Sequence, residues 1–278
     1  MEEEKPKKTI EEQQEEEKVK LSIGTQIDNL FVELEKHFYS RDKQSFQTVL
    51  SEVKELMIKG GDWDRRNRLA VYEGLSLILF NRDFVNATTL IVPAINTYEL
   101  STFMPYNRFV FIASISGILI LDRQSLKKSI LDNPEVIMAT ADIPELLEMA
   151  NALYISNYAV FMENLKKVIV LMLNDDIIEQ TTDWWCREMR IKAYSQMLRS
   201  YLSMKLEIFA AEFGVSVEFI EKELETFIAQ GRLHCQIDKV NGIIMNSHKD
   251  KRNDLYVTLI KDGDVVVEKV QRLLHKLE

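Results

Sequence analysis

The sequence is poor in helix-breaking residues and in cysteine. It contains only 9 Gly and 5 Pro among 278 residues, a scarcity that favours long helices over many short strands bounded by turns. Its two cysteines, Cys186 and Cys235, are too few for a disulfide framework and indicate a reducing compartment. The composition therefore predicts a mainly α-helical, intracellular protein.

An excess of basic charge and long apolar runs are also missing. The formal net charge is −9, so no overall positive field attracts nucleic acid or anionic lipid. The longest apolar run, 109–121, has 13 residues, whereas a membrane-spanning helix needs about 20. We expect this run to form a buried core helix. We expect neither a nucleic-acid partner nor a membrane.

Motifs that carry enzyme chemistry are absent as well. The sequence has no glycine-rich phosphate loop, no CxxC pair and no HExxH pattern. His234 and Cys235 are adjacent, but neighbouring side chains on a strand point to opposite faces. Asp175 and Asp176 precede a short helix, where acidic residues commonly act as caps. We predict no enzyme activity, cofactor, metal or small-molecule substrate, with a hydrolase site assembled from distant residues as the alternative.

Helical periodicity with frequent interruptions fills residues 23–180. Three interruptions, near residues 41, 82 and 157, share one pattern: an aromatic residue, a short polar turn, then another helix. A helical hairpin that repeats at intervals of roughly 34 to 47 residues is typical of an α-solenoid. We therefore predict a TPR-like solenoid of helical hairpins, preceded by a charged N-terminal extension over residues 1–22. An irregular helical bundle is the alternative.

Two short helices joined by a glycine turn are predicted within residues 181–250. A strong helix over 184–201 comes first, with its apolar residues three and four positions apart. Ser203 and Ser216 are suited to cap the two helices that follow, and Gly214 supplies the turn between them. Gly231 then ends the second helix. This order is that of a helix-turn-helix.

A β-hairpin follows directly. Residues 233–238 alternate between apolar and polar, which predicts a half-buried strand. The dipeptide at 241–242 is Asn-Gly, a turn signal, and the apolar residues 243–245 predict the second strand. A helix-turn-helix followed by a β-hairpin is a winged helix.

Winged helices often bind DNA through their second helix, but here that helix is acidic. It carries four glutamates against one lysine, which opposes insertion between phosphates. The preceding helix has a basic cluster, which we interpret as a solvated face, with nucleic-acid binding as the alternative. The glutamates are Glu218, Glu221, Glu223 and Glu225, and the basic cluster is Arg187, Arg190, Lys192 and Arg199.

A final helix is predicted within residues 251–278, after a polar loop over 246–254. Its apolar positions recur every three and four residues, which forms a heptad seam. The seam either packs on its own domain or joins helices of other chains. It consists of Leu259, Val266, Val270, Leu273 and Leu277, with Gly263 at the remaining position.

Helical hairpins that lead into a winged helix are the plan of the PCI family, which the proteasome lid, the signalosome and translation-initiation factor three share. Four strings in particular resemble the PCI subunits of the 26S proteasome lid, and the similarity extends over about residues 60–278. Before Gly60 the sequence is short and hard to match, so we expect early hairpins of the family to be missing. The strings are Gly60–Leu69 (GGDWDRRNRL), Arg187–Gln196 (REMRIKAYSQ), Phe213–Ile220 (FGVSVEFI) and Phe227–Asn241 (FIAQGRLHCQIDKVN).

The resemblance implies a non-catalytic scaffold subunit of the lid, in cytoplasm and nucleus. Its implied partners are other PCI subunits, the lid's deubiquitinase subunit and the proteasome ATPase ring. A PCI scaffold subunit of the signalosome or of initiation factor three is the alternative. The resemblance makes the helix seam a bundle contact, and it makes one strand region the contact with other PCI subunits: Leu233, His234, Cys235, Gln236, Ile237 and Asp238.

Overall fold

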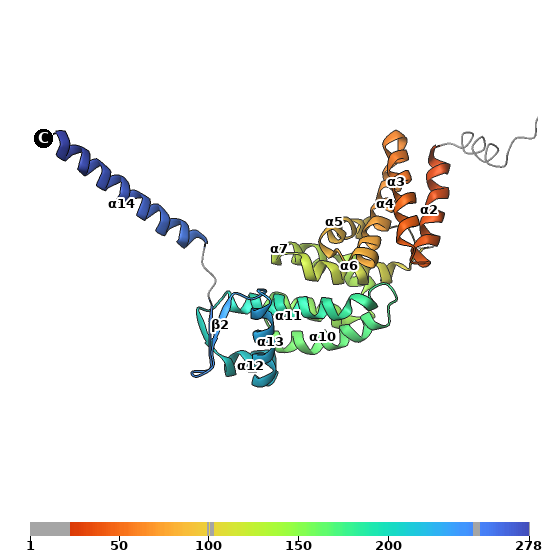
Figure 1. Ribbon diagram of the computed structural model, residues 1–278. Helices are drawn as coiled ribbons and strands as arrows, with labels where there is room; N and C mark the ends of the chain where they lie inside the picture. The colour runs from red at the N-terminus through yellow and green to blue at the C-terminus, as the bar shows by residue number, and fades with distance from the viewer. Residues whose placement is uncertain (1–22, 99, 101–102, 247–250, 278) are drawn as a thin grey trace, which may run out of the picture. The chain divides into compact units, whose positions relative to one another are not determined.

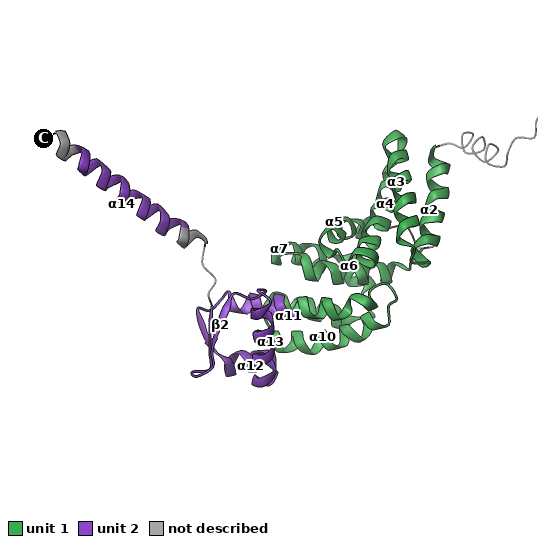
Figure 2. Cartoon of the chain, viewed as in Figure 1, with its two compact units in different colours: residues 1–189 green, residues 190–278 purple. Residues whose placement is uncertain are grey.

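The computed structural model describes residues 23–98, 100, 103–246 and 251–277. The predicted extension over residues 1–22 lies outside this description. The chain divides into two compact units, residues 1–189 and 190–278 (Figure 2). Helical hairpins, a winged helix and a C-terminal helix follow one another along the chain, as predicted (Figure 1). The predicted domain limits at residues 22, 180 and 250 stay predictions.

The first unit consists of helices that pack against their neighbours in sequence. The closest packed pairs are α2 with α3, α4 with α5, α5 with α6, and α9 with α10. These pairs arise because each helix has one apolar face that it must bury against the next. The helices are α2 (Ile23–Tyr39), α3 (Lys43–Gly60), α4 (Trp63–Ser76), α5 (Phe84–Ala94), α6 (Tyr106–Ile120), α7 (Arg123–Leu126), α8 (Pro134–Ala139), α9 (Pro144–Ile155) and α10 (Tyr158–Leu173).

Helix α6 forms the centre of this unit. Every residue from Phe109 to Leu119 is buried, so the predicted core helix is confirmed. The indole of Trp185 donates a hydrogen bond of 3.1 Å to the carbonyl oxygen of Ile115. A Cβ atom at Gly117 would lie 2.6 Å from the side chain of Ile130, so glycine is what lets this neighbour approach.

The three similar turns predicted from the sequence share one backbone geometry. In each, a residue other than glycine adopts a left-handed conformation, with φ of 57°, 55° or 69°. The next residue is Asp or Asn, and its side chain accepts a hydrogen bond from a backbone N–H in the first turn of the following helix. The pairs are Arg41 with Asp42, Arg82 with Asp83, and Ser156 with Asn157.

The same polar residue ends one helix and begins the next. The N–H of Asp42 donates to the carbonyl of His37 at 3.1 Å, and the N–H of Asn157 donates to that of Ala152 at 2.8 Å. These bonds satisfy carbonyls that the end of a helix leaves without a partner. The predicted hairpin turns at 41, 82 and 157 are therefore confirmed, and each is built from only a few residues.

Asp62 directly precedes α4, but its side chain does not cap that helix. It occupies the N-cap position of α4 without a side-chain cap hydrogen bond. Its carboxylate instead accepts from Nη1 of Arg65 at 2.6 Å. Arg65 also donates to both carboxylate oxygens of Asp28, at 3.0 and 2.9 Å, and this pairing lowers the pKa of Asp28. Arg65 thus joins α2 and α4 through a tertiary ion pair with Asp28.

The second unit contains a winged helix. Helix α11 (Thr182–Leu198) runs across the boundary between the units. The sheet has the order β1-β3-β2 and both pairings are antiparallel, so β3 is central. The elements are β1 (Ser203–Lys205), α12 (Leu206–Phe213), α13 (Val217–Ala229), β2 (Cys235–Asp238), β3 (Ile243–Asn246) and, after a gap in the description, α14 (Lys251–Leu277).

Strand β1 was not predicted, and the predicted cap at Ser203 is wrong. Ser203 pairs with Met245 in the sheet, and α12 begins at Leu206 without a side-chain cap. Three residues are too few for a period-two signal, and the partner strand lies about forty residues away. The predicted loop over 246–254 is also shorter, because Asn246 belongs to β3 and α14 begins at Lys251.

The left-handed turns lead to a stability prediction. Arg82 has φ of 55° and an exposed side chain, so Arg82→Gly removes backbone strain at the cost of chain entropy. We expect the free energy of unfolding to stay unchanged or to rise by up to about 1 kcal/mol. The matched control is Lys166→Gly on the exposed face of α10, which should lower it by about 1 kcal/mol. Urea denaturation measures both, and an equal loss in the two variants would contradict the turn geometry.

Candidate partner interface

The winged helix is held together by an aromatic cluster. Tyr194 on α11 packs edge-on against Phe213 of α12, with ring centroids 4.7 Å apart. Phe209 lies 5.0 Å from Phe213, and Phe227 of α13 lies 6.2 Å from Tyr194. All four side chains are buried. This cluster fixes the two short helices against the end of α11 and so positions the sheet that follows them.

One glutamate of α13 points into this core. Glu223 accepts a hydrogen bond of 2.6 Å from the hydroxyl of Tyr194 and pairs with Nη2 of Arg190 at 2.9 Å. Its side chain is only 14% exposed. From the sequence, Glu223 is one of four glutamates that oppose DNA insertion, and Arg190 belongs to a basic cluster interpreted as a solvated face. The structure joins them as one ion pair between α11 and α13.

Two other glutamates of α13 face the turn of the wing. The ammonium group of Lys239, between β2 and β3, lies 3.2 Å from a carboxylate oxygen of Glu221 and contacts Glu225 as well. A DNA-reading helix needs cations free to contact phosphates, and here the lysine of the wing is engaged by carboxylates. The electrostatics of α13 therefore oppose groove binding.

Strand β2 lies at an edge of the three-stranded sheet, because β3 pairs with it on one side only. An edge strand presents unpaired backbone groups to a partner strand. Leu233 and His234 precede β2, and the strand itself contains the other four residues predicted from the resemblance. Leu233 and Cys235 are buried, His234 and Gln236 are exposed, and Ile237 and Asp238 are half-buried. Of the six side chains, those of His234 and Gln236 are the most exposed to solvent.

Two of these strand residues have structural roles. Burial raises the pKa of the Cys235 thiol to about 11, so it stays protonated at neutral pH and is a poor nucleophile. The Asp238 carboxylate accepts hydrogen bonds from the backbone N–H groups of Val240 and Asn241, and from the Asn241 side chain at 2.8 Å. These bonds lower the pKa of Asp238 and hold the turn of the wing.

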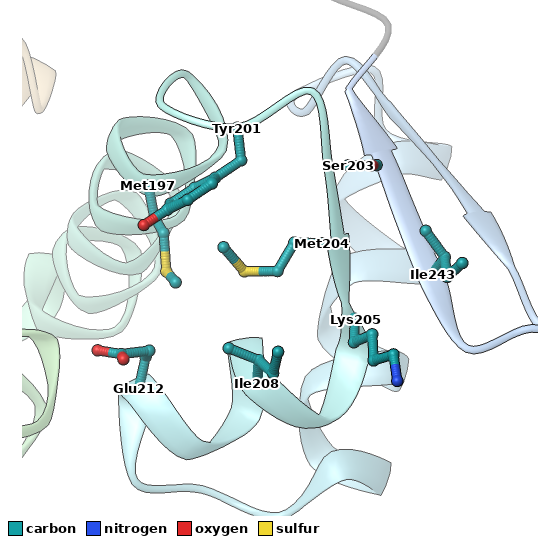
Figure 3. Close-up of a pocket in the computed structure, with 8 residues that line it drawn as sticks. All are labelled: Met197, Tyr201, Ser203, Met204, Lys205, Ile208, Glu212 and Ile243. Atoms are coloured by element: carbon teal, nitrogen blue, oxygen red, sulfur yellow. The ribbon is translucent and has the colours of Figure 1, made fainter.

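A hollow of about 370 Å³ opens beside the sheet (Figure 3). Met204 of β1 lies in its centre, between Met197 of α11 and Ile208 of α12. Tyr201 and the exposed Ile208 extend its apolar lining. Leu202, next to Tyr201 in the sequence, is 87% exposed. Sequence reasoning missed this surface, because it assigned the region around 203 to a helix.

Helix α14 displays the predicted heptad seam. Val270 is 50% exposed, and the other seam residues whose side chains are described are exposed too. Leu277 lies within α14, but its side chain is outside the described part. An exposed apolar stripe on a long helix is typical of a surface that packs against other helices. Those described seam residues are Leu259, Val266, Val270 and Leu273.

Groups of side chains able to hold a metal ion were sought in the described ranges. There, no three His, Cys, Asp or Glu side chains are placed to hold a metal ion. Asp175 binds Nε and Nη2 of Arg108 at 2.6 and 3.1 Å and accepts from the N–H of Ile177. Asp175, the first of the two adjacent acidic residues singled out in the sequence, is thus engaged in a structural ion pair with Arg108. Among the described helices, none combines the length and apolar character of a membrane span.

A helical-hairpin region that leads into a winged helix defines the class of PCI-domain proteins. Residues 165–248 match the PCI domain, and residues 7–129 match the family described as 26S proteasome subunit RPN7. The chain therefore contains a region similar to RPN7 followed by a region that matches the PCI domain. Because the match begins at residue 7, the expectation that the similarity starts near Gly60 is wrong.

Curated relatives agree with this assignment. The chain is 38% identical over 253 residues to a 26S proteasome non-ATPase regulatory subunit 6 homolog of Arabidopsis thaliana, covering 91% of this chain and 65% of the relative. It is 33% identical over 256 residues to the 26S proteasome regulatory subunit RPN7 of Saccharomyces cerevisiae, covering 91% and 59%. The chain thus spans less than two thirds of the length of these relatives. COP9 signalosome complex subunit 1 of Arabidopsis thaliana is 30% identical over 166 residues, covering 59% and 38%.

The Glu223 ion pair leads to a second stability prediction. Glu223→Gln removes a charge from a mostly buried pair and leaves the Arg190 charge less compensated, so we expect a loss of about 2 kcal/mol. Glu225→Gln on the same helix weakens only an exposed pair and should cost at most about 0.5 kcal/mol. Thermal denaturation followed by circular dichroism compares the two. Similar costs would mean that the Glu223 pair does not hold α13 to α11.

Proposed function

We propose that this chain is a non-catalytic structural subunit of the 26S proteasome lid. The observation that carries the proposal is the presence of an RPN7 match and a PCI match on one chain. The similar curated proteins are named as regulatory and non-ATPase subunits of the proteasome. A scaffold requires exposed contact surfaces rather than a reactive centre, and the winged helix offers such surfaces.

Two surfaces supply the contacts in this proposal. The edge of β2 and the side chains near it, from Leu233 to Asp238, pair with another PCI subunit by strand addition. The seam of α14, from Leu259 to Leu277, enters a bundle with helices of other subunits. Backbone groups of β2 contribute more than its side chains, because Leu233 and Cys235 are buried.

The proposed partners are other PCI subunits, the deubiquitinase subunit of the lid and the proteasome ATPase ring. The complex would act in cytoplasm and nucleus, where it organises the regulatory particle for the degradation of ubiquitinated proteins. A signalosome subunit is the second candidate, supported by the 30% identity to COP9 signalosome complex subunit 1. That similarity covers 59% of this chain, against 91% for the proteasome relatives, so we favour the lid.

Affinity purification from native extract tests the complex. With a tag at the N-terminus, away from α14, we expect mass spectrometry to identify lid subunits and proteasome ATPases together. Recovery of signalosome subunits without proteasome ATPases would support the second candidate. Recovery of neither group would overturn the scaffold proposal.

The α14 seam yields a variant with a defined phenotype. Val270→Asp places a charge on the apolar stripe, so we expect incorporation into the lid to fall about tenfold or more. The isolated chain should keep its melting temperature, because Val270 is half exposed there. Gln271→Asp adds the same charge at the neighbouring position outside the seam and serves as the control. Unfolding of the isolated Val270→Asp chain would show instead that α14 packs on its own domain.

A further inference from the structure

The turn of the wing contains a dipeptide with a chemistry of its own. Asn241 is the only asparagine of the sequence that glycine follows. Its side chain is exposed, and Val240 beside it is 93% exposed, so solvent reaches this turn. Gly242 has φ of 62°, and a Cβ atom placed on it would meet no other atom within 4 Å. The backbone nitrogen of Gly242 is therefore less shielded than it would be in a residue with a side chain.

We propose that Asn241 is a site of spontaneous deamidation, with water as the co-reactant. The backbone nitrogen of Gly242 attacks Cγ of Asn241, so that a new C–N bond closes a succinimide ring and the Cγ–Nδ2 bond breaks. The proton of the attacking nitrogen leaves with the amide group as ammonia. Water then opens the ring at either carbonyl, which gives aspartate or isoaspartate, and no oxidant or reductant takes part. This inference concerns only the wing of this chain and does not depend on the proposed lid function.

A second asparagine of the chain has the same hydrogen-bonding partners. Nδ2 of Asn241 donates to the Asp238 carboxylate at 2.8 Å, and the backbone N–H of Asn241 donates to the other oxygen of that carboxylate. Asn86, in the first turn of α5, is exposed as well and makes both bonds to Asp83, with its Nδ2 at 2.6 Å. The two amide groups are therefore matched, and the difference between them lies in the residue that follows.

The residue after Asn86 is held by a helix. It is Ala87, whose N–H donates to the carbonyl of Asp83 at 3.2 Å and whose side chain is buried. Ring closure requires rotation about ψ of the asparagine, and the helix fixes that angle. Gly242 instead lies in a turn between two strands, where its permissive backbone allows the rotation. We therefore expect Asn241 to react much faster than Asn86.

The product changes the electrostatics of the turn. The hydrogen bond from the Asn241 side chain is the main reason that the pKa of Asp238 is lowered. Deamidation replaces this donor with a carboxylate, so two negative groups face each other. Isoaspartate also adds a methylene group to the backbone, which shifts Ile243 relative to Asp238, its partner in the sheet. The carbonyl of Gly242 accepts from the N–H of Leu206 at 2.8 Å, so the change reaches the start of α12. Deamidation therefore loosens the wing.

Peptide mass spectrometry of the purified full chain, incubated at physiological temperature in a mildly alkaline buffer, tests the proposal. We expect the wing peptide to gain about 1 Da, as separable aspartate and isoaspartate forms. The peptide with Asn86 should react at least about tenfold more slowly. In Gly242→Ala a methyl group hinders the attack, so the rate at Asn241 should fall about tenfold or more, and circular dichroism checks that this variant is folded. Asn241→Gln keeps the amide but requires a larger ring, and its wing peptide should gain no mass.

Asn241→Asp reproduces one of the two products and tests the effect on the wing. We expect amide hydrogen exchange in β2 and β3 to become about threefold faster or more. Asn241→Ala removes the same hydrogen bond without adding a charge and should change the exchange less. Equal exchange in the two variants would contradict repulsion between the carboxylates.

Three results would overturn the site. Equal rates at Asn241 and Asn86, or an unchanged rate in folded Gly242→Ala, would exclude attack by the Gly242 nitrogen. Aspartate without isoaspartate would replace ring closure with direct hydrolysis. An intact Asn241 in the folded chain, with reaction only in urea, would show that the wing prevents the reaction. None of these results affects the recovery of lid subunits, so the proposed scaffold function is tested separately.

Discussion

Reversal of the chain between successive helices is the constraint on which the first unit depends. At three positions a left-handed residue is followed directly by Asp or Asn, which closes one helix and caps the next. Such a turn leaves no room for a long loop, so two helices come to lie side by side and bury their apolar faces against each other. Because the turn residues are Arg and Ser rather than Gly, each turn includes some backbone strain.

In the winged helix, charged side chains form ion pairs with one another within the module. Glu223 turns inward to Arg190 and Tyr194, and Lys239 binds the outward glutamates. Charges that a DNA-binding relative of this architecture would direct at phosphates are instead satisfied within the module. What stays accessible is a sheet edge and an apolar hollow. Both suit contacts with protein surfaces, and they are the physical basis for the proposed connecting role.

Features with a local cause were predictable from the sequence. The hairpin turns at 41, 82 and 157, the buried run 109–119, the glycine turn at 214 and the Asn-Gly turn of the wing each depend on a few neighbouring residues. The candidate interface was predictable only in part. The alternation of residues predicted a strand over 233–238, of which β2 covers 235–238, but which of its side chains are buried depends on helices that pack over the sheet.

The sequence by itself determined the class of fold, because periodicity, caps and turn residues act within a few positions of one another. Its strings also pointed to the family. Only the tertiary structure decided that Ser203 joins a sheet through Met245 and that Glu223 pairs with Arg190. These contacts join residues 42 and 33 positions apart. Such contacts form only after the apolar faces have packed, so no local pattern in the sequence encodes them.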